Sequence, residues 1–438
     1  MTYDQAIEYL YGLGLFGAKP GLERALRLAD LAGNPQKRLR FIHVAGTNGK
    51  GSTCAMLESV YRSSGLKVGL FTSPHLVSFS ERIQINRFPV SPSDVVDLVR
   101  RVQAWIAHGW ASPASLGTYE DHPTFFEVVT ILALIYFAEQ RCDLVIWETG
   151  LGGRLDATNI VTPLASVVTN VQWDHQQWLG GTLREIAFEK AGIFKPGVPA
   201  FMAATEHEAV EEIRRVALEL HIPLEEVTQN DLARLGLDVV PIPLFGAHQR
   251  LNAALAACVI RGLNFQLPVP HTALCEGLSQ VAWRGRFEVF KRPSGGIVVV
   301  DGAHNPAGAS ALREALTIRY PNVTCCMIFG VLSDKDWPSI IRSLASLPHR
   351  VLLVPVRSER SANPTDLKAA WAELNPCCQI QSPTHLREAL EMSSTEPLTV
   401  VLGSLFLVGE ALRLLNAPAP AEAAFDESAL NEWGGIRN

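Results

Sequence analysis

The sequence lacks the features of a membrane protein, a secreted protein or a nucleic-acid binder. Its longest apolar run, 128–138, is shorter than the roughly 20 residues that a membrane-spanning helix needs. The N-terminus has no basic segment followed by an apolar one, as a secretion signal would have. The net charge of −6 provides no basic excess for nucleic acid or anionic lipid. We therefore expect a cytoplasmic protein with no nucleic-acid and no membrane partner.

The cysteines also lack the pattern of a structural metal site. The eight cysteines are scattered, apart from the neighbours Cys325-Cys326 and Cys377-Cys378. Neither pair has the CxxC spacing or the nearby histidines of a zinc site. Reduced thiols are therefore expected, as in most cytoplasmic proteins.

The segment 41–53 organises the chain. An apolar run is followed by a loop with three glycines and then by a helical segment, an arrangement that directs backbone N–H groups at an anion. Lys50 can place a positive charge against a phosphate, and Ser52 or the threonine after it can offer a hydroxyl near a metal. Unlike in the common P-loop, Val44 replaces the first glycine and Gly51 separates the lysine from the hydroxyls. An exposed polar turn is the alternative, but this composition favours a nucleotide phosphate site.

Short apolar segments alternate with amphipathic ones in two series. The predicted strands are 41–45, 67–71, 144–147, 164–169 and 198–202, then 297–301, 323–329, 350–355, 377–381 and 398–402. Such alternation predicts parallel sheets covered by helices on both faces. A further helix is predicted after Pro92, with Ser93 as a possible cap.

The length of 438 residues exceeds what one hydrophobic core usually serves, so two α/β domains are expected. The first, over 1–285, is a P-loop NTPase-like domain with a mostly parallel sheet. The second, over 297–416, is smaller and doubly wound, as in Rossmann-like folds. A hinge is expected at 286–296 and a loosely attached tail at 417–438.

Polar residues follow several of the predicted strands. The loops 46–52, 72–75, 148–156 and 170–175 all do so, and ligands of open α/β sheets bind at such strand ends. Glu148 ends a strand beside a glycine-rich loop, which favours a Mg²⁺ ligand over a simple turn cap. Asp174-His175 is either a solvated loop or a metal position with mixed ligands.

Other residues admit two interpretations. Lys190 is either a surface lysine or a buried amine with a depressed pKa. The segment 301–306 is either a second ligand surface or the turn and N-cap of a helix, and both can be true. Ser404 can join that surface, although alone it is typical of a helix cap.

Six motifs together resemble one family. They are Gly46-Thr-Asn-Gly-Lys-Gly-Ser52, Ser73-Pro-His-Leu76, Glu148-Thr-Gly-Leu-Gly-Gly-Arg-Leu-Asp-Ala-Thr-Asn159, Asp174-His175, Glu189-Lys-Ala-Gly-Ile193 and Asp301-Gly-Ala-His-Asn-Pro306. In this order they resemble folylpolyglutamate synthase/dihydrofolate synthase, a branch of the Mur ligase superfamily, over the chain as far as about residue 415. The irregular P-loop is this family's own form.

The resemblance implies an ATP-dependent acid–amino-acid ligase. A folate carboxylate, and that of dihydropteroate as well, would attack the γ-phosphate, and the amine of L-glutamate would displace phosphate from the acyl phosphate. Phosphoryl transfer of this kind mainly needs positioning and charge neutralisation, which the glycine loop, Lys50 and two Mg²⁺ would provide. A monomer is expected.

The resemblance also implies roles for individual residues. Catalysis would involve Lys50, Lys190, His175 and His304. ATP would be bound by Asn48, Gly49, Lys50, Gly51 and Ser52, and from the far side of a cleft by Asn252, Arg286 and Asp301. The metal ligands would be Ser52, Ser73, Glu148, His175 and Lys190, the last as a carbamate. The folate or dihydropteroate would contact Thr124, Phe125, Phe126, Glu127, Leu155, Asp156 and Ala157, and the glutamate His304 and Ser404.

Two rival functions fit less well. A Mur peptidoglycan ligase would carry an extra nucleotide-sugar domain before the loop, and only 45 residues precede Gly46. A P-loop kinase or NTPase would more often carry Ser or Thr directly after the lysine, and it leaves the second α/β domain unexplained.

Overall fold

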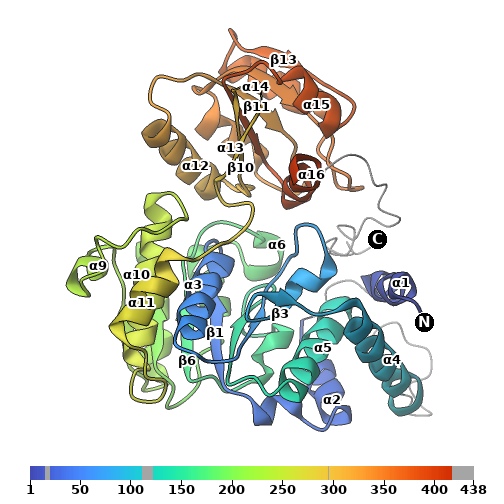
Figure 1. Ribbon diagram of the computed structural model, residues 1–438, viewed down its shortest axis with the longest axis vertical. Coiled ribbons are helices and arrows are strands. Elements are labelled where there is room, and N and C mark those ends of the chain that lie inside the picture. Colours follow the sequence, from blue (N-terminus) through green and yellow to red (C-terminus); the bar gives the residue numbers. More distant parts are fainter. Residues whose placement is uncertain (15–19, 111–121, 294, 417–438) are drawn as a thin grey trace. The chain divides into compact units, whose positions relative to one another are not determined.

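The computed structural model describes residues 1–14, 20–110, 122–293 and 295–416, which form two compact units (Figure 1). Within these ranges, the first unit comprises residues up to Pro243 together with Arg250–Val281. The second comprises Leu244–Gln249 and the residues from Ala282 onward. The expected tail 417–438 lies outside the described residues.

The first unit is built on a sheet with the strand order β4-β3-β2-β5-β1-β6-β7-β8. Its strands are β1 (Phe41–Ala45), β2 (Val68–Phe71), β3 (Ile83–Ile85), β4 (Phe88–Pro89), β5 (Leu144–Glu148), β6 (Ala165–Val168), β7 (Ala200–Met202) and β8 (Leu224–Glu226). All neighbours are parallel except β2 with β3 and β3 with β4. The predicted parallel core is therefore confirmed, and an antiparallel hairpin extends one edge.

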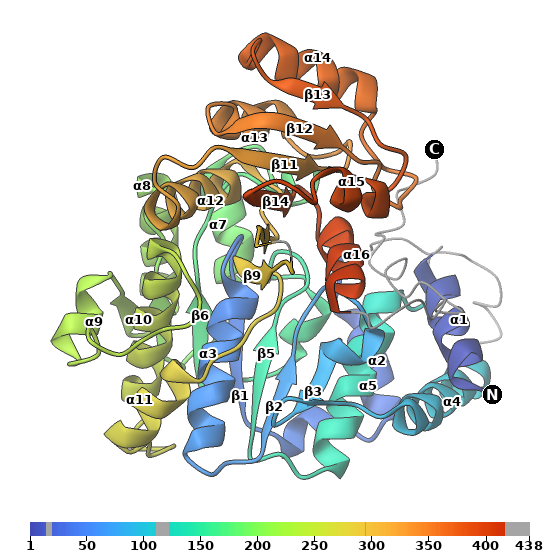
Figure 2. The same ribbon diagram turned by 45° about the horizontal axis from the view of Figure 1, so that its top comes forward.

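Helices cover both faces of this sheet (Figure 2). They are α1 (Tyr3–Leu13), α2 (Glu23–Leu31), η2 (Pro35–Arg38), α3 (Lys50–Ser63), η3 (Phe79–Arg82), α4 (Pro92–Gly109), α5 (Phe125–Glu139), η4 (Ala157–Ile160), α6 (Gln176–Leu179), α7 (Leu183–Ala191), α8 (His207–Glu219), α9 (Asn230–Arg234), α10 (Ala247–Gly262) and α11 (His271–Ser279). Phe41 and Trp147 pack with α1, α2, α4 and α5 in one core. Because side chains alternate along a strand, Ile42 points to the other face, where α3 crosses β1, β2 and β5.

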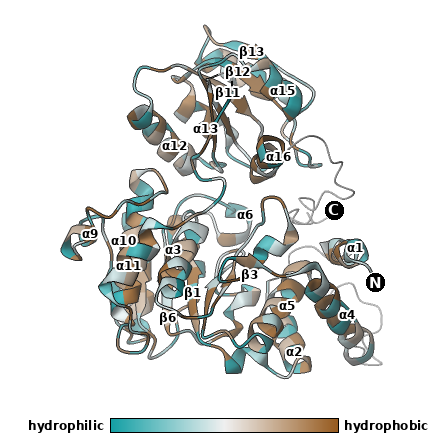
Figure 3. Ribbon diagram, in the orientation of Figure 1, coloured by the Kyte–Doolittle hydropathy of each residue, from teal (hydrophilic) through white to brown (hydrophobic). Residues whose placement is uncertain are grey.

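The second unit contains a sheet with the strand order β13-β12-β11-β14-β10-β9. The strands are β9 (Glu288–Lys291), β10 (Ile297–Val300), β11 (Cys325–Phe329), β12 (Pro348–Leu353), β13 (Gln379–Gln381) and β14 (Leu398–Leu402). All pairs are parallel except β9 with β10. The helices are α12 (Pro306–Arg319), α13 (Trp337–Leu344), α14 (Pro364–Leu374), α15 (Leu386–Met392) and α16 (Leu405–Asn416). The buried strands of both sheets are the strongly apolar segments in Figure 3.

The structure differs from the sequence-based expectations at several points, including the unpredicted strand β8. The residues after β2 form the hairpin β3–β4, which their short, mixed sequence did not indicate. The segment expected as a hinge carries β9, so it is part of the second sheet. Ser91, and not Ser93, caps α4, because its side chain accepts a hydrogen bond from the backbone N–H of Asp94.

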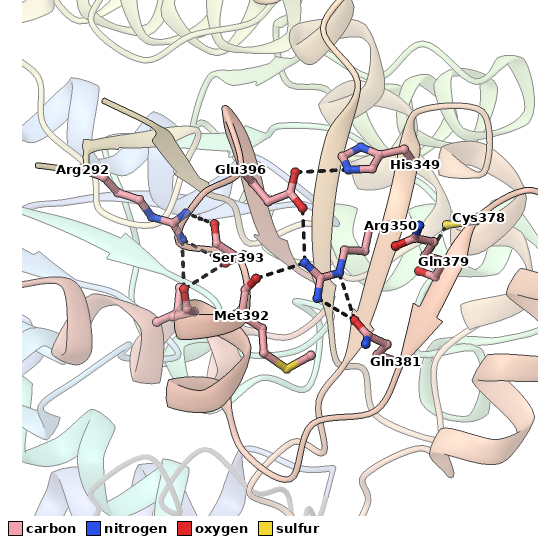
Figure 4. Close-up of polar contacts among 10 residues, drawn as sticks. Arg292, His349, Arg350, Cys378, Gln379, Gln381, Met392, Ser393 and Glu396 are labelled. Carbon is pink, nitrogen blue, oxygen red and sulfur yellow. Dashed lines mark hydrogen bonds and ion pairs between the residues drawn. The ribbon is translucent and has the colours of Figure 1, made fainter. Parts of the chain in front are cut away.

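A polar network fixes α15 at the amino ends of the second unit's strands (Figure 4). Arg350 donates to the carbonyl of Met392 at 3.0 Å and to the carboxylate of Glu396 at 3.3 Å. Arg292 donates to the carbonyl and the hydroxyl of Ser393. Cations beside the last carbonyls of a helix are favourable, so this network stabilises the unit at the edge opposite its strand carboxyl ends.

The most apolar helix of the first unit is α5, which is buried on nearly all sides. Among the described helices, none combines the length and the apolar character needed to cross a membrane.

Candidate functional site

The predicted loops of the first unit meet at the carboxyl ends of β2, β5, β1 and β6, which are neighbours in the sheet. The backbone N–H of Thr149 donates to Val44, and that of Thr169 donates to Ala45. The backbone N–H of Ser73 donates to the carboxylate of Glu148 at 3.2 Å. The expected convergence of the loops is therefore present within one unit.

The glycine loop packs closely against the loop after β6. The N–H of Asn48 donates to the side-chain oxygen of Asn170 at 2.7 Å, and the hydroxyl of Thr169 donates to the carbonyl of Asn48 at 2.6 Å. Gly46 has φ +151°, and a Cβ there would lie 1.9 Å from the hydroxyl oxygen of Thr169. Only glycine fits so close an approach, so these contacts explain the glycine that begins the loop.

Asn252 lies beside the same loop. Gly49 has φ +82°, and a Cβ added to it would lie 2.6 Å from the side-chain oxygen of Asn252. Asn252 is buried in α10 and belongs to the first unit. Asn252 therefore lies in the unit that carries the glycine loop, within the range expected for the first domain.

Two lysines donate to one carbonyl of the loop. The Nζ atoms of Lys50 and Lys190 each lie 2.9 Å from the carbonyl oxygen of Gly46. Lys190 is 3% exposed, so the buried alternative is correct. Burial, and then the charge of Lys50, lower the pKa of the Lys190 amine to about 7, although Asp174 and Asp156 raise it. A substantial fraction of this amine is therefore neutral near neutral pH.

Two hydroxyl groups at the start of α3 are buried without a hydrogen-bond partner in the described part of the chain. The Oγ of Ser52 and the Oγ1 of Thr53 are buried, and neither has a hydrogen-bond partner among the described residues. An orphaned buried hydroxyl costs free energy unless a ligand satisfies it. The helix N-terminus, Lys50 and Ser52 therefore fit a bound phosphate with its cation.

The candidate metal ligands fit a hard cation. Glu148 is 3% exposed and contacts the Ser73 backbone, while Ser52 contributes a free hydroxyl. In the described part of the chain, no three His, Cys, Asp or Glu side chains gather closely enough to hold a metal alone. Mg²⁺ commonly uses one or two carboxylates and completes its shell with water and phosphate oxygens. The residues present suit that mode.

His175 begins α6 in a left-handed conformation with φ +51°. Its Nε2 lies 3.7 Å from the carboxylate of Asp174, and its side chain is one-third exposed. An accessible imidazole therefore lies beside a carboxylate at the end of the loop after β6.

The loop after β5 is fixed from within by Asp156. Its carboxylate accepts from the N–H groups of Gly150 at 3.0 Å and Leu151 at 2.8 Å, and from both the N–H and the hydroxyl of Thr158. Because the Thr158 hydroxyl donates to Asp156, it accepts from the Nε2 of His43 at 2.9 Å. Burial raises the pKa of Asp156, and these hydrogen bonds oppose that rise. Asp156 therefore shapes the loop.

The other residues expected to bind folate divide into two groups. Phe125, Phe126 and Leu155 are half-buried, while Ala157 is buried at the start of η4. Thr124 caps α5, and its N–H donates to the carboxylate of Glu127 at 2.7 Å. Glu127 also accepts from Arg24 at 3.0 Å, so this carboxylate joins α2 to α5. Phe125 and Phe126 are thus half-buried aromatic residues in the first turn of α5.

A second polar group lies at the carboxyl ends of β10 and β14 in the second unit. The Asp301 carboxylate accepts from the N–H groups of Phe287 and Ala303, and the Nδ1 of His304 donates to Gly302 at 2.7 Å. Arg286 lies close by, since a Cβ on Gly302 would approach its guanidinium. Ser404 accepts from the N–H of Phe406 and therefore begins α16 as a cap.

Asn305 caps α12, with Pro306 in the first turn, so the helix-start interpretation of this segment is correct. This role leaves the ligand interpretation of Asp301 and His304 open. Arg24 carried no signal in the sequence, because its partner Glu127 lies 103 positions away. Thr158 and Asn170 lie in segments that the sequence singled out, but their partners His43 and Asn48 were not evident from it.

Comparisons with known proteins agree with this geometry. The family model described as Mur ligase middle domain matches residues 44–260, and that described as Mur ligase, glutamate ligase domain matches 285–405. A dihydrofolate synthase/folylpolyglutamate synthase of Bacillus subtilis is 35% identical, covering 95% of this chain and 99% of the relative.

Two solved structures extend the likeness. A folylpolyglutamate synthase of Thermotoga maritima has a TM-score of 0.81 at 31% identity, covering 98% of this chain and 99% of its own. The E. coli FolC protein in complex with DHPP and ADP has a TM-score of 0.83 at 29% identity, covering 95% of this chain and 98% of its own.

Proposed function

Because this chain belongs to the Mur ligase family, in the branch of folylpolyglutamate and dihydrofolate synthases, we propose that it joins L-glutamate to a folate carboxylate, and also to dihydropteroate. It is an ATP-dependent ligase. The observation that carries the proposal is the group of buried, ligand-ready residues at one sheet edge: Ser52 without a partner, Glu148 and Lys190.

The reaction proceeds in two steps. The substrate carboxylate attacks the γ-phosphorus of ATP, so that ADP leaves and an acyl phosphate forms. The amine of L-glutamate then attacks the acyl carbon, phosphate leaves, and an amide bond is formed. The backbone N–H groups of the glycine loop and Lys50 hold the phosphates and stabilise the charge on the transferred group. We also assign ATP contacts to Arg286 and Asp301, as the family resemblance implies.

Mg²⁺ supplies charge neutralisation when bound, and Ser52, Ser73, Glu148 and His175 would hold it. The buried amine of Lys190 suits a carbamate, since only a neutral amine adds CO₂ and the pKa of this lysine is about 7. As an anion it would add an oxygen ligand. These assignments are supported by the buried Ser52 hydroxyl and the desolvated Lys190 amine.

The substrates are assigned by the character of the surfaces. Phe125, Phe126 and Leu155 offer half-buried apolar surface to the pteridine and aminobenzoyl rings. His304 and Ser404, at neighbouring strand ends of the second unit, would lie near the incoming glutamate. We infer a cytoplasmic monomer, which size-exclusion chromatography with light scattering tests.

The deciding experiment is a phosphate-release assay with dihydropteroate and tetrahydrofolate in parallel, each with and without L-glutamate. The expected result is release that needs both a folate-type carboxylate and glutamate, together with a product heavier by one glutamyl residue. Equal ATP turnover without either substrate would favour a simple NTPase. Activity with tetrahydrofolate alone would restrict the enzyme to folylpolyglutamate synthesis.

A further inference from the structure

Arg82 is a buried cation in the first unit that the sequence did not single out. It ends η3 and is 3% exposed. Burying a guanidinium is costly unless charges and hydrogen-bond acceptors compensate for the lost water. The residues that surround Arg82 therefore indicate its role.

One set of contacts holds the segment after β2. The carbonyl of Arg82 accepts from the N–H of Thr72 at 3.1 Å, and its Nε donates to the Nδ1 of His75 at 2.9 Å. An Nδ1 that accepts a hydrogen bond carries no proton, so His75 is the neutral tautomer with hydrogen on Nε2. Arg82 therefore holds both ends of the segment from Thr72 to His75 through hydrogen bonds. This segment contains Ser73, whose backbone N–H donates to the carboxylate of Glu148.

A second contact reaches the start of α5. The guanidinium carbon of Arg82 lies 5.3 Å from the centroid of the Phe125 ring, within the range of a cation–π interaction. Burial lowers the pKa of Arg82 to about 9, and the charges of Glu81 and then Glu148 oppose that effect. The guanidinium therefore lies close to the segment from Thr72 to His75, to the carboxylate of Glu148 and to the Phe125 ring.

We propose that Arg82 is a positioning residue for the ligase reaction, because it holds the segment from Thr72 to His75 and the Phe125 ring in one fixed arrangement. The inference rests on the proposed function, since it takes Ser73 and Glu148 as metal-side groups and Phe125 as a folate contact. Without the guanidinium, the segment from Thr72 to His75 and the Phe125 ring can shift relative to each other. A displacement of about 1 Å in such a site can reduce kcat/KM by about 100-fold.

The test compares Arg82→Met and Arg82→Lys with a control, Arg27→Met. Arg27 lies 4.5 Å from the Trp110 ring centroid and donates to the Trp110 carbonyl at 2.8 Å in the same unit, and Trp110 is not one of the site residues. Thermal unfolding, ADP affinity, folate affinity by calorimetry, kcat, KM and the Mg²⁺ concentration for half-maximal rate are measured for each variant.

For Arg82→Met we expect ADP affinity within about twofold of wild type, a KM for folate about tenfold higher, a reduced kcat and a higher Mg²⁺ requirement. Arg82→Lys keeps the charge but lacks the planar guanidinium donors, so its kcat, KM and Mg²⁺ requirement should lie between those of Arg82→Met and wild type. Arg27→Met should change thermal stability alone. A folded Arg82→Met with unchanged KM, kcat and Mg²⁺ requirement would overturn the inference.

His75→Leu removes the acceptor while Arg82 stays in place, and it supplies the same test if Arg82→Met does not fold. The same rise in KM and Mg²⁺ requirement is expected, and unchanged values would count against the proposal. Wild-type protein without glutamate-dependent turnover would instead refute the proposed function. The two failures are therefore distinguishable.

Discussion

The Nζ of Lys190 lies 2.9 Å from the carbonyl oxygen of Gly46, although 144 positions separate the two residues. This contact joins α7 to the first residue of the glycine loop. Replacing Lys190 with alanine should reduce ligase turnover by about 100-fold, a loss typical of a charge-stabilising group. If a carbamate is the active form, small carboxylates should partly restore the rate in a phosphate-release assay.

Lys195→Ala is the matched control for this change. Lys195 is partly buried, lies five residues further on and donates to the carbonyl of Asn159 at 3.3 Å. Its loss should leave turnover nearly unchanged. Turnover of Lys190→Ala close to that of wild type, without any effect of carboxylates, would contradict the role of Lys190.

His43 should make the fold sensitive to acid. Burial, and then the charge of Lys195, lower the pKa of its imidazole from the ordinary value of 6.5 to about 3. Because the folded-state pKa lies below the unfolded one, stability is fully present above pH 6.5 and is lost as the pH falls towards 3. In this window His43 should lower the free energy of unfolding by about 1.4 kcal/mol per pH unit.

Urea unfolding of wild type and His43→Gln at about pH 7 and about pH 5 measures this contribution. Glutamine can still donate to Thr158 but does not titrate. The variant should therefore lose less stability between the two conditions. Equal losses in both proteins would show that His43 does not titrate as expected.

Asp156→Asn should disturb the loop after β5. The amide keeps one acceptor oxygen but presents its NH₂ group to N–H donors such as those of Gly150 and Leu151. The unmade hydrogen bonds should lower the free energy of unfolding by about 1–3 kcal/mol, and the displaced loop should raise the KM for folate.

Asp231→Asn provides the comparison for Asp156. Asp231 is also buried, and it accepts from the N–H of Thr228 at 2.7 Å and from its hydroxyl at 3.2 Å. It belongs to a different turn of the same unit, so its loss should lower stability without changing KM. A KM effect of the same size in both variants would remove the specific role of Asp156.

The two ends of α5 permit a test of ion-pair burial. Arg24 pairs with Glu127 at 2.9 Å, with side chains 14% and 3% exposed, whereas Arg101 pairs with Glu139 at 2.6 Å, with side chains 34% and 47% exposed. Arg24→Met leaves a buried carboxylate unpaired and should cost about 3 kcal/mol, while Arg101→Met should cost less than about 1 kcal/mol.

Denaturant unfolding monitored by circular dichroism distinguishes these two changes. Arg24→Met should also raise the KM for folate, because Glu127 belongs to the first turn of the helix that carries Phe125 and Phe126. Equal destabilisation by both variants would mean that burial does not decide the strength of these pairs.

The sequence by itself determined the parallel strands, the order of the loops and the residues that follow each strand. Apolar runs and the glycines that end them are properties of contiguous residues, so they could be recognised without the structure. The hairpin β3–β4 and the strands β8 and β9 were missed because strands of two to four residues carry too little periodic pattern. The N-cap of α4 was predicted two residues too late, at Ser93 instead of Ser91, because so short a segment carries too little pattern.

Only the tertiary structure decided which side chains are buried and which have partners. Lys190 could have been a surface lysine until α7 brought it to Gly46. The roles of Glu127 and Arg82 depend on partners in other elements. Burial and hydrogen bonding arise from residues distant in the sequence, and these contacts set the pKa of Lys190 and the position of Arg82.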